Sequence, residues 1–262
     1  MKTILIAYSV YGEDDKYLVG ALRNAELRRE YDILGKVTQV FVLGNDVPLW
    51  VAAGLERRGA EVLRGGLWTD HPVLARQTVA DLPCDAFFIR DVDSRPGPRE
   101  VHAMAAWMRS SEPFHIMRDH PYHFNPIMAG MWGGIPRMFQ DPHPKMIDRI
   151  IAWKENNPRP PLGHHYGYDQ RFVAESLWPL MQQHGVLQHD SFHRTRFSGS
   201  VPFPDGDPTT HFVGAVFDAE DRPDQGHAAY REAVLLDGAK LCHTCGTLLT
   251  EEEPSCKCNA HE

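Results

Sequence analysis

The sequence predicts an α/β protein built on a mostly parallel sheet, and two observations carry this prediction. Short apolar runs bounded by turn residues alternate with segments whose apolar residues recur at helical spacing. Strands that alternate with helices favour a parallel sheet with right-handed crossovers. The length of 262 residues suits one large domain, or a main domain with a small appendage.

The apolar runs and the amphipathic segments follow one another in order along the chain. We expect strands at residues 2–8, 37–43, 61–64, 84–90, 114–117 and 127–132. We expect helices in the segment that carries Leu18, Ala21, Leu22 and Ala25 on one face, and at about 47–58, 73–82, 99–110, 144–155 and 169–184. Residues 191–225 are rich in Pro, Gly, Asp and Phe, which predicts irregular loops.

Composition and charge exclude several classes of protein. The formal charge is −8 and the isoelectric point is near 6.0, so the overall field does not favour nucleic acid as a partner. No apolar run approaches the roughly 20 residues that span a bilayer, so no transmembrane segment is expected. The apolar stretch Ile4–Tyr8 is too short for the core of a signal peptide, and the chain is therefore expected to be cytoplasmic.

Four of the five cysteines lie near the end of the chain, in two close pairs separated by ten residues. Four thiolates suit tetrahedral Zn²⁺, so we expect a structural zinc knuckle formed by Cys242, Cys245, Cys256 and Cys258. Free thiols or an iron–sulfur centre are the alternatives, because the second pair has the less common one-residue spacing. The predicted division is a main domain at 1–235 and a cysteine tail at 236–262.

Two carboxylates separated by one residue follow the strand at 84–90. Asp91 and Asp93 stand where ligands of open α/β sheets collect, beyond the carboxyl end of a strand. Such a pair can hold a hard divalent cation and leave open positions for diphosphate oxygens. The alternative is that both side chains only cap the next helix or form turn hydrogen bonds.

The run from Phe87 to Arg95 resembles the metal and nucleotide-diphosphate motif of glycosyltransferases with the GT-A fold. Residues 114–121 and 127–133 are similar to the middle of a bacterial and viral group of these enzymes. Tyr168-Asp169-Gln170 is similar to the Asp-Gln element of retaining members related to glycogenin and lipopolysaccharide galactosyltransferases. The resemblance extends over roughly residues 1–220 by order of elements and implies a GT-A-like, Rossmann-like fold.

For the donor side, the resemblance implies that the loop after the first strand holds the base and ribose of the nucleotide. The residues concerned are Ala7, Tyr8, Tyr11 and Gly12. Tyr8 is the preferred base contact, because an aromatic ring stacks on a base. The alternative is that Tyr8 only completes its strand.

The resemblance also implies charged contacts to the donor. Arg76 is expected to reach the diphosphate as a fixed cation, and Arg118 and Asp119 are expected to contact the donor sugar. A solvated helix charge and an exposed ion pair are the respective alternatives.

In the same family, Mn²⁺ or Mg²⁺ takes two acidic ligands and usually a histidine. Here the resemblance implies Asp91, Asp93 and His189, with His193 or His211 as alternatives to the histidine.

The remaining implied residues concern the reaction and the acceptor. Asp169 would bind donor-sugar hydroxyls and Gln170 would lie beside the anomeric carbon, with retention of configuration. A plain acidic residue at a helix start is the alternative reading of Asp169. His120, His123 and Trp132 would line the acceptor side.

The sequence therefore predicts a metal-dependent glycosyltransferase of the hexosyltransferase kind. It would move a sugar from a nucleoside diphosphate sugar to a glycan, lipid-linked or other hydroxyl acceptor. A metal-dependent phosphohydrolase or nucleotidyltransferase is one alternative. A zinc-ribbon interaction protein on an inactive α/β domain is the other.

Overall fold

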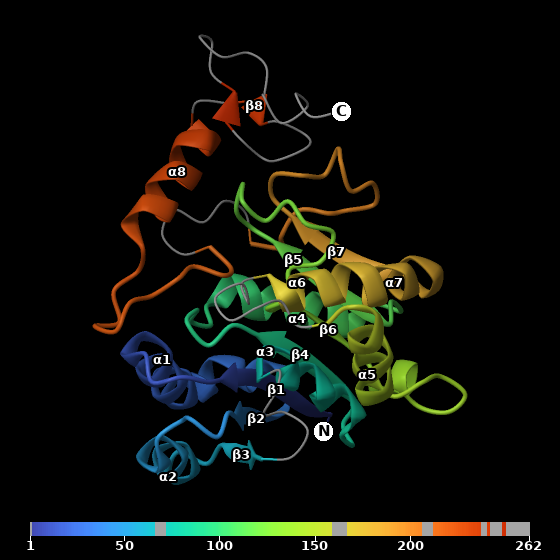
Figure 1. Cartoon of the computed structure of the whole chain (residues 1–262). Helices are drawn as coiled ribbons and strands as arrows, with labels where there is room; N and C mark the ends of the chain where they lie inside the picture. Colours follow the sequence, from blue (N-terminus) through green and yellow to red (C-terminus); the bar gives the residue numbers. More distant parts are fainter. Residues whose placement is uncertain are drawn as a thin grey trace.

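A seven-stranded sheet with helices packed on both faces forms the centre of the molecule (Figure 1). The computed structural model describes residues 2–65, 72–158, 167–205, 212–236, 240–241 and 248–249. The strand order is β3-β2-β1-β4-β6-β5-β7. The strands are β1 (Thr3–Val10), β2 (Lys36–Leu43), β3 (Glu61–Arg64), β4 (Ala86–Arg90), β5 (Phe114–Arg118), β6 (Met131–Gly134) and β7 (Val186–Asp190).

Within this sheet β6 pairs antiparallel with β4 and β5, and the other pairings are parallel. The mostly parallel sheet flanked by helices that the sequence predicts is thus confirmed. A separate antiparallel pair joins β8 (Lys240–Leu241) to β9 (Leu248–Leu249).

The helices of the described residues include several short or irregular turns. The α-helices are α1 (Asp15–Glu26), α2 (Leu49–Arg57), α3 (Pro72–Ala75), α4 (Pro98–Arg109), α5 (Met146–Asn156), α6 (Tyr168–Phe172), α7 (Trp178–His184) and α8 (Gln225–Leu236). The 3₁₀ turns are η1 (Leu27–Leu34), η2 (Arg76–Asp81) and η3 (Pro136–Phe139), and η4 (Val173–Leu177) is a π-helical turn. Because η4 lies directly between α6 and α7, these three form one helical stretch.

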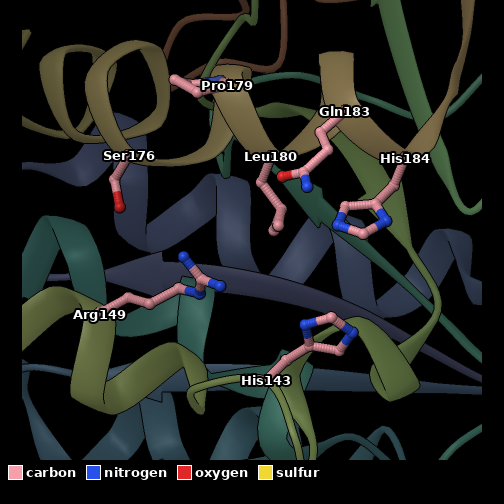
Figure 2. A pocket seen from close by; sticks show the side chains of 7 residues that line it. All are labelled: His143, Arg149, Ser176, Pro179, Leu180, Gln183 and His184. Carbon is pink, nitrogen blue, oxygen red and sulfur yellow. The ribbon is translucent and has the colours of Figure 1, made fainter.

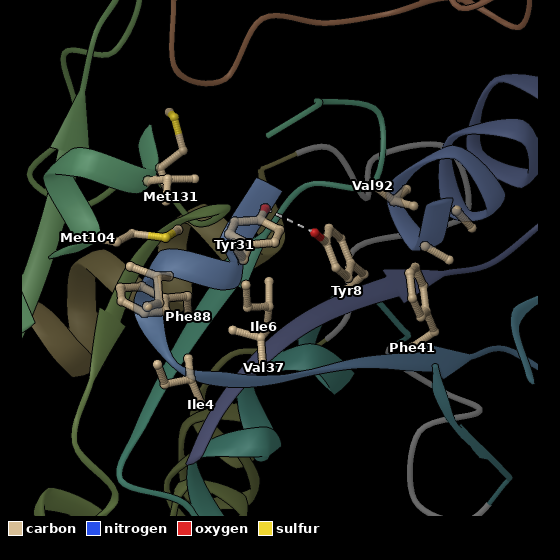
Figure 3. Packing of buried hydrophobic residues seen from close by; sticks show 14 of the residues in the cluster. Ile4, Ile6, Tyr8, Tyr31, Val37, Phe41, Phe88, Val92, Met104 and Met131 are labelled. Atoms are coloured by element: carbon tan, nitrogen blue, oxygen red, sulfur yellow. Dashed lines mark hydrogen bonds between the residues drawn. The ribbon is translucent and has the colours of Figure 1, made fainter. Parts of the chain in front are cut away.

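Alternation along β1 separates two cores, one on each face of the sheet. Ile4, Ile6 and Tyr8 pack with α1, α2 and α4 (Figure 3). Leu5 and Ala7 pack with η2, α5 and α6 on the other face. Successive side chains of a strand point to opposite faces, so both faces of a central strand must be apolar.

Parallel pairing brings the carboxyl ends of β1, β4, β5 and β7 to one edge of the sheet. The residues singled out by the sequence that lie in the loops beyond these ends include Tyr11, Gly12, Asp91, Asp93, Asp119, His120 and His123. We call this the carboxyl edge.

Several boundaries differ from the expectation. The strand expected at 127–132 is β6 at Met131–Gly134, and residues 127–130 form the loop before it. The helix expected at 73–82 divides into α3 and the 3₁₀ turn η2. Helix α8 falls beyond the segments for which the sequence predicted helices. None of the helices in the described ranges is long and apolar enough to cross a membrane.

Candidate functional site

Helix α1 holds the turn after β4 that carries Asp91 and Asp93, which we call the acidic turn. The side-chain amide of Asn24 donates to the backbone oxygens of Val92 and Ser94 at 2.8 and 2.9 Å. A Cβ atom on Gly20 would lie 2.4 Å from the Val92 oxygen, so glycine allows the helix to approach the turn closely. The turn is therefore fixed before any ligand arrives.

A buried arginine joins the acidic turn to helix α6. The Arg76 guanidinium donates to an Asp91 carboxylate oxygen at 2.5 Å and to an Asp169 carboxylate oxygen at 2.7 Å. The Arg76 side chain is 6% exposed, and Asp169 is 12% exposed. Asp91 differs, because 43% of its side chain is exposed. We call Arg76, Asp91 and Asp169 the Arg76 cluster.

The pKa values of the two carboxylates of the Arg76 cluster are shifted in opposite directions. Burial disfavours the charged form of Asp91, but the charge and hydrogen bond of Arg76 outweigh it, and the pKa of Asp91 lies below its usual value. Burial raises the pKa of Asp169 above its usual value, even though Arg76 opposes the change. Divergent pKa values in neighbouring carboxylates are a feature of functional sites.

Gly130 makes room for the Asp91 carboxylate. A Cβ atom at this position would lie 2.0 Å from Asp91 Oδ2. The same oxygen accepts no hydrogen bond from the described residues, whereas Oδ1 accepts one from Arg76. Asp91 is thus partly exposed and keeps one oxygen without a hydrogen bond from the described residues, beside the backbone of the loop before β6.

Lys16 and Tyr11 complete the polar surface at the end of β1. The Lys16 ammonium lies 2.7 Å from an Asp93 carboxylate oxygen. Tyr11 is 40% exposed, and burial raises its pKa to about 12, with Arg76 and Asp169 also acting on it. The Tyr11 hydroxyl is therefore neutral at ordinary pH. Gly12 follows with a positive φ of 75° and donates its N–H to Asp46 at 2.9 Å.

Gln170 is bound to the backbone of the loop before β6. Its side-chain oxygen accepts the N–H of Ala129 at 3.1 Å, and its amide nitrogen donates to the Ile127 oxygen. Gln170 therefore holds the loop that ends at Gly130, and Gly130 in turn lies beside the Asp91 carboxylate. The role expected for Gln170 beside an anomeric carbon stays a prediction.

The residues of the acidic turn fit a divalent cation that is bound largely by its substrate. Mg²⁺ is commonly held by one or two carboxylates together with phosphate oxygens and water. The acidic turn carries two such carboxylates, those of Asp91 and Asp93, and the role expected for them as metal ligands stays a prediction. The described residues contain no group of three or more His, Cys, Asp or Glu side chains that could hold a metal ion.

His189 does not reach the acidic turn, which corrects the expected third ligand. Strand β7 lies three positions from β4 in the sheet, roughly 14 Å at ordinary strand spacing. The His189 ring is instead buried, with Nδ1 2.8 Å from Nε2 of His115. The alternative His193 is also buried, with Nε2 2.8 Å from the Pro121 oxygen, and His211 lies outside the described residues.

Three other expected contacts are buried in the core. Tyr8 is 0% exposed, stacks on Phe41 and lies with its hydroxyl 3.3 Å from that of Tyr31 (Figure 3). Ala7 points to the opposite core, and Trp132 donates its indole N–H to Gln77 at 3.1 Å. Tyr8 is therefore not a base contact and Trp132 does not line an acceptor surface. The exposed aromatic side chain beside the Arg76 cluster is Tyr11.

Arg118 and Asp119 lie at the carboxyl edge but are fully buried, so they do not form an exposed ion pair. Arg118 pairs with Asp190 at 2.6 Å. Asp119 accepts from Arg99 at 2.7 and 3.0 Å and from Arg231 of α8 at 3.0 Å. We call Asp119, Arg99 and Arg231 the Asp119 cluster. The buried carboxylate of Asp119 is not available to a donor sugar in this structure.

His120 and His123 belong to a group of rings between the loop after β5 and helix α8. The ring of His120 lies 5.5 Å from that of His123 and 5.5 Å from that of His227. Tyr122, which is 46% exposed, stacks on Tyr230 at 4.8 Å. Burial lowers the pKa of His120 to about 4, so this imidazole is neutral. A role for His120 and His123 toward an acceptor stays a prediction.

The expected zinc ligands Cys242, Cys245, Cys256 and Cys258 lie outside the described residues. Cys84 is free and half-buried.

No protein-family model and no curated protein matches the chain. Among solved structures, the chain is similar to the galactosyltransferase LgtC in complex with donor and acceptor sugar analogs. The two chains are 13% identical, the match covers 83% of this chain and 92% of that chain, and the TM-score is 0.43. It is also similar to glucosyl-3-phosphoglycerate synthase from Mycobacterium tuberculosis in complex with Mg²⁺ and uridine diphosphate (10% identity, 71% and 80% covered, TM-score 0.37). A third similar structure is a nucleotidyl transferase from Methanothermobacter (11% identity, 70% and 83% covered, TM-score 0.40).

These similar proteins include glycosyltransferases, as the resemblance in the sequence implies. At such low identity and TM-scores, no activity is carried from them to this chain. The residues of the Arg76 cluster and the acidic turn carry the functional argument.

Sequence reasoning missed Asn24, Lys16 and Gly130 as parts of this site. Asn24 lies in the last turn of α1, next to Ala25 on the face where the apolar residues recur, and a polar side chain on such a face is a signal of a specific contact. Gly130 stands inside the strand expected at 127–132, where a glycine often marks the close approach of another group. Lys16 carries no such signal in the sequence.

Proposed function

We propose that the protein is a metal-dependent glycosyltransferase that uses a nucleoside diphosphate sugar. The observation that carries the proposal is the Arg76 cluster, in which a buried arginine holds an exposed carboxylate with one free oxygen at the carboxyl edge. A bound Mn²⁺ or Mg²⁺ would neutralise the charge that develops on the leaving diphosphate.

The chain's own residues would position the donor around that charge. Asp91 and Asp93 would hold the cation, and Tyr11 would stack on the base or ribose from the end of β1. Arg76 would keep Asp91 ionised and oriented, because it binds the other oxygen of that carboxylate. Asp169, held by the second arm of Arg76, would accept hydrogen bonds from hydroxyls of the donor sugar.

Lys16 has two states in this proposal. It neutralises Asp93 in the free protein, where the two groups are 2.7 Å apart. With a cation at Asp93, the Lys16 ammonium would be free to turn toward the diphosphate. The long flexible stem of lysine makes this movement inexpensive.

The test is a thermal-shift screen with UDP, GDP, CDP and ADP, each with and without Mn²⁺. A ligand that binds the native state raises its melting temperature by mass action. We expect one diphosphate to stabilise the protein only when Mn²⁺ is present. The double variant Asp91→Asn, Asp93→Asn should lose this shift, and Glu56→Gln on the exposed surface of α2 should keep it.

Turnover then separates the proposal from its alternatives. We expect release of the nucleoside diphosphate from the matching sugar donor, accelerated by a hydroxyl acceptor. Release of phosphate without any acceptor would show a phosphohydrolase instead. No shift with any nucleotide, and no effect of the double variant, would favour an interaction protein on an inactive domain.

A further inference from the structure

A pocket lies on the face of the sheet that packs against α5 and α6, and none of its lining residues belongs to the acidic turn. It has a volume of about 410 Å³ and lies between the start of α5 and the stretch from η4 to α7 (Figure 2). This volume falls in the range of small-molecule sites, about 300–1,000 Å³. Its wall includes an apolar part, formed by Leu180 and Pro179.

The polar side chains of this pocket are hydrogen-bond donors or groups that can donate, and none is a carboxylate. They are Arg149, His143, His184, Ser176 and Gln183. Figure 2 shows the Arg149 guanidinium directed into the space between the two helical segments, with His143 and His184 on the opposite side. The rings of these two histidines are 5.5 Å apart and nearly perpendicular.

Arg149 is a cation without a partner among the described residues. Its Nε is buried and makes no hydrogen bond. Burial lowers the pKa of Arg149, and no carboxylate offsets this effect. Arginine nevertheless stays charged in proteins. A partly buried guanidinium with an unsatisfied N–H is unfavourable unless an acceptor completes it.

We propose that this pocket is an anion site that takes the phosphate group of a small molecule. The planar fork of Arg149 matches two phosphate oxygens, and the imidazoles, the Ser176 hydroxyl and the Gln183 amide can donate to the others. The apolar wall at Leu180 would accommodate the organic part of a phosphate ester.

This inference goes beyond the proposed glycosyl transfer, because the pocket shares no residue with the Arg76 cluster. The two sites are nevertheless linked by the chain. Asp169 lies in α6, and the pocket residues Ser176, Leu180 and His184 lie in the η4 and α7 turns of the same helical stretch.

The test is a titration of the full chain with inorganic phosphate. The NMR signals of the ring protons of His143 and His184 monitor binding. His143→Gln and His184→Gln assign the two signals. Sodium chloride at equal ionic strength controls for screening. We expect saturable shifts of both signals with phosphate and none with chloride.

Variants then show whether Arg149 carries the binding. Arg149→Met should weaken phosphate binding at least tenfold, whereas Lys154→Met on the same helix should leave it unchanged. Asp91→Asn should also leave it unchanged, which separates this site from the proposed active site. If Arg149→Met fails to fold, His143→Gln provides the second variant, because it should weaken the phosphate-dependent shift of His184.

A comparison of two probes identifies the source of the phosphate group. Tighter binding of glycerol phosphate than of inorganic phosphate assigns the site to phosphate esters, and equal binding assigns it to the free anion. The proposal is overturned by the absence of a saturable shift with both probes, or by equal phosphate binding in Arg149→Met and Lys154→Met.

Discussion

Two clusters of acids and arginines lie at the carboxyl edge of one sheet, and they differ in what each leaves accessible. In the Asp119 cluster the carboxylate is 0% exposed and accepts from Arg99, Arg231, Ser191 and the backbone of Val213. In the Arg76 cluster the carboxylate of Asp91 is 43% exposed and has one oxygen without a hydrogen bond.

The difference shows how a binding group can be told from a structural one of the same chemical type. A buried charge whose hydrogen bonds are all made within the protein joins segments of chain, here α4, the end of β5 and α8. A carboxylate that is oriented by one oxygen and accessible at the other can still bind a cation or a ligand. Acidic residues at strand exits therefore need their remaining hydrogen-bonding capacity counted before a function is assigned.

The largest expected effect is a loss of stability when Asp119 is removed. Asp119→Ala removes the buried carboxylate that both Arg99 and Arg231 bind, and breaking a buried ion pair lowers the free energy of unfolding by about 3–5 kcal/mol. Urea unfolding followed by circular dichroism measures the change. Asp91→Ala removes one charged hydrogen bond from the buried Arg76, which keeps its bond to Asp169, so it should lower the same quantity less, by about 1.5–3 kcal/mol. Equal losses in both variants would contradict the distinction between the clusters.

The next effect concerns ligand binding, for which the Arg76 cluster should matter more than the Asp119 cluster. Asp91→Asn should weaken Mn²⁺-dependent binding of the nucleoside diphosphate by about 10–100-fold, because even residues that only orient metal ligands have effects of this size. Isothermal titration calorimetry measures the affinity. Glu56→Gln is the control, because Glu56 is exposed on α2 and this variant should bind as the unchanged protein does. Unchanged affinity in Asp91→Asn would exclude this carboxylate as a ligand.

Much of the fold follows from local patterns in the sequence. The strand expected at 61–64 is β3, and the apolar runs at 37–43 and 84–90 lie in β2 and β4. The position of the acidic turn at the carboxyl edge follows from the same alternation, because parallel strands end at one edge. These features depend only on residues close together in the chain.

The direction of individual side chains did not follow from such patterns. Tyr8 ends an apolar run, and the alternation of a strand buried on both faces does not show that its ring meets Phe41 and Tyr31 in the core. His189 also ends an apolar run, but the sheet order places its strand three positions away from Asp91. Both errors concern contacts between residues distant in sequence, which local periodicity does not contain.

A smaller effect, on pH dependence, is expected from the buried histidines near the Asp119 cluster. Burial lowers the pKa of His189 to about 4, and the charge of Arg99 acts in the same direction. Between about pH 6.5 and pH 4 the unfolded chain therefore binds a proton that the folded chain does not. Stability should fall as the pH falls through this range, by about 1.4 kcal/mol per pH unit for this histidine.

His189→Gln tests this contribution, because glutamine does not titrate and can still bond to His115. Unfolding by urea at several pH values should give a slope that is smaller than in the unchanged protein by about 1.4 kcal/mol per pH unit. Other buried histidines will retain part of the slope. An unchanged slope would show that His189 is protonated alike in the folded and unfolded chains.

The smallest expected effect is on nucleotide affinity, when the free oxygen of Asp91 is displaced. Gly130→Ala places a Cβ atom 2.0 Å from Asp91 Oδ2, so the carboxylate must turn away while the cluster stays charged. We expect metal-dependent nucleotide affinity to fall about fivefold, which corresponds to about 1 kcal/mol. Gly97→Ala is the matched control, because its added Cβ atom meets nothing within 4 Å. If Gly130→Ala binds as Gly97→Ala does, then the orientation of Asp91 is not what the ligand requires, and accessibility alone distinguishes the two clusters.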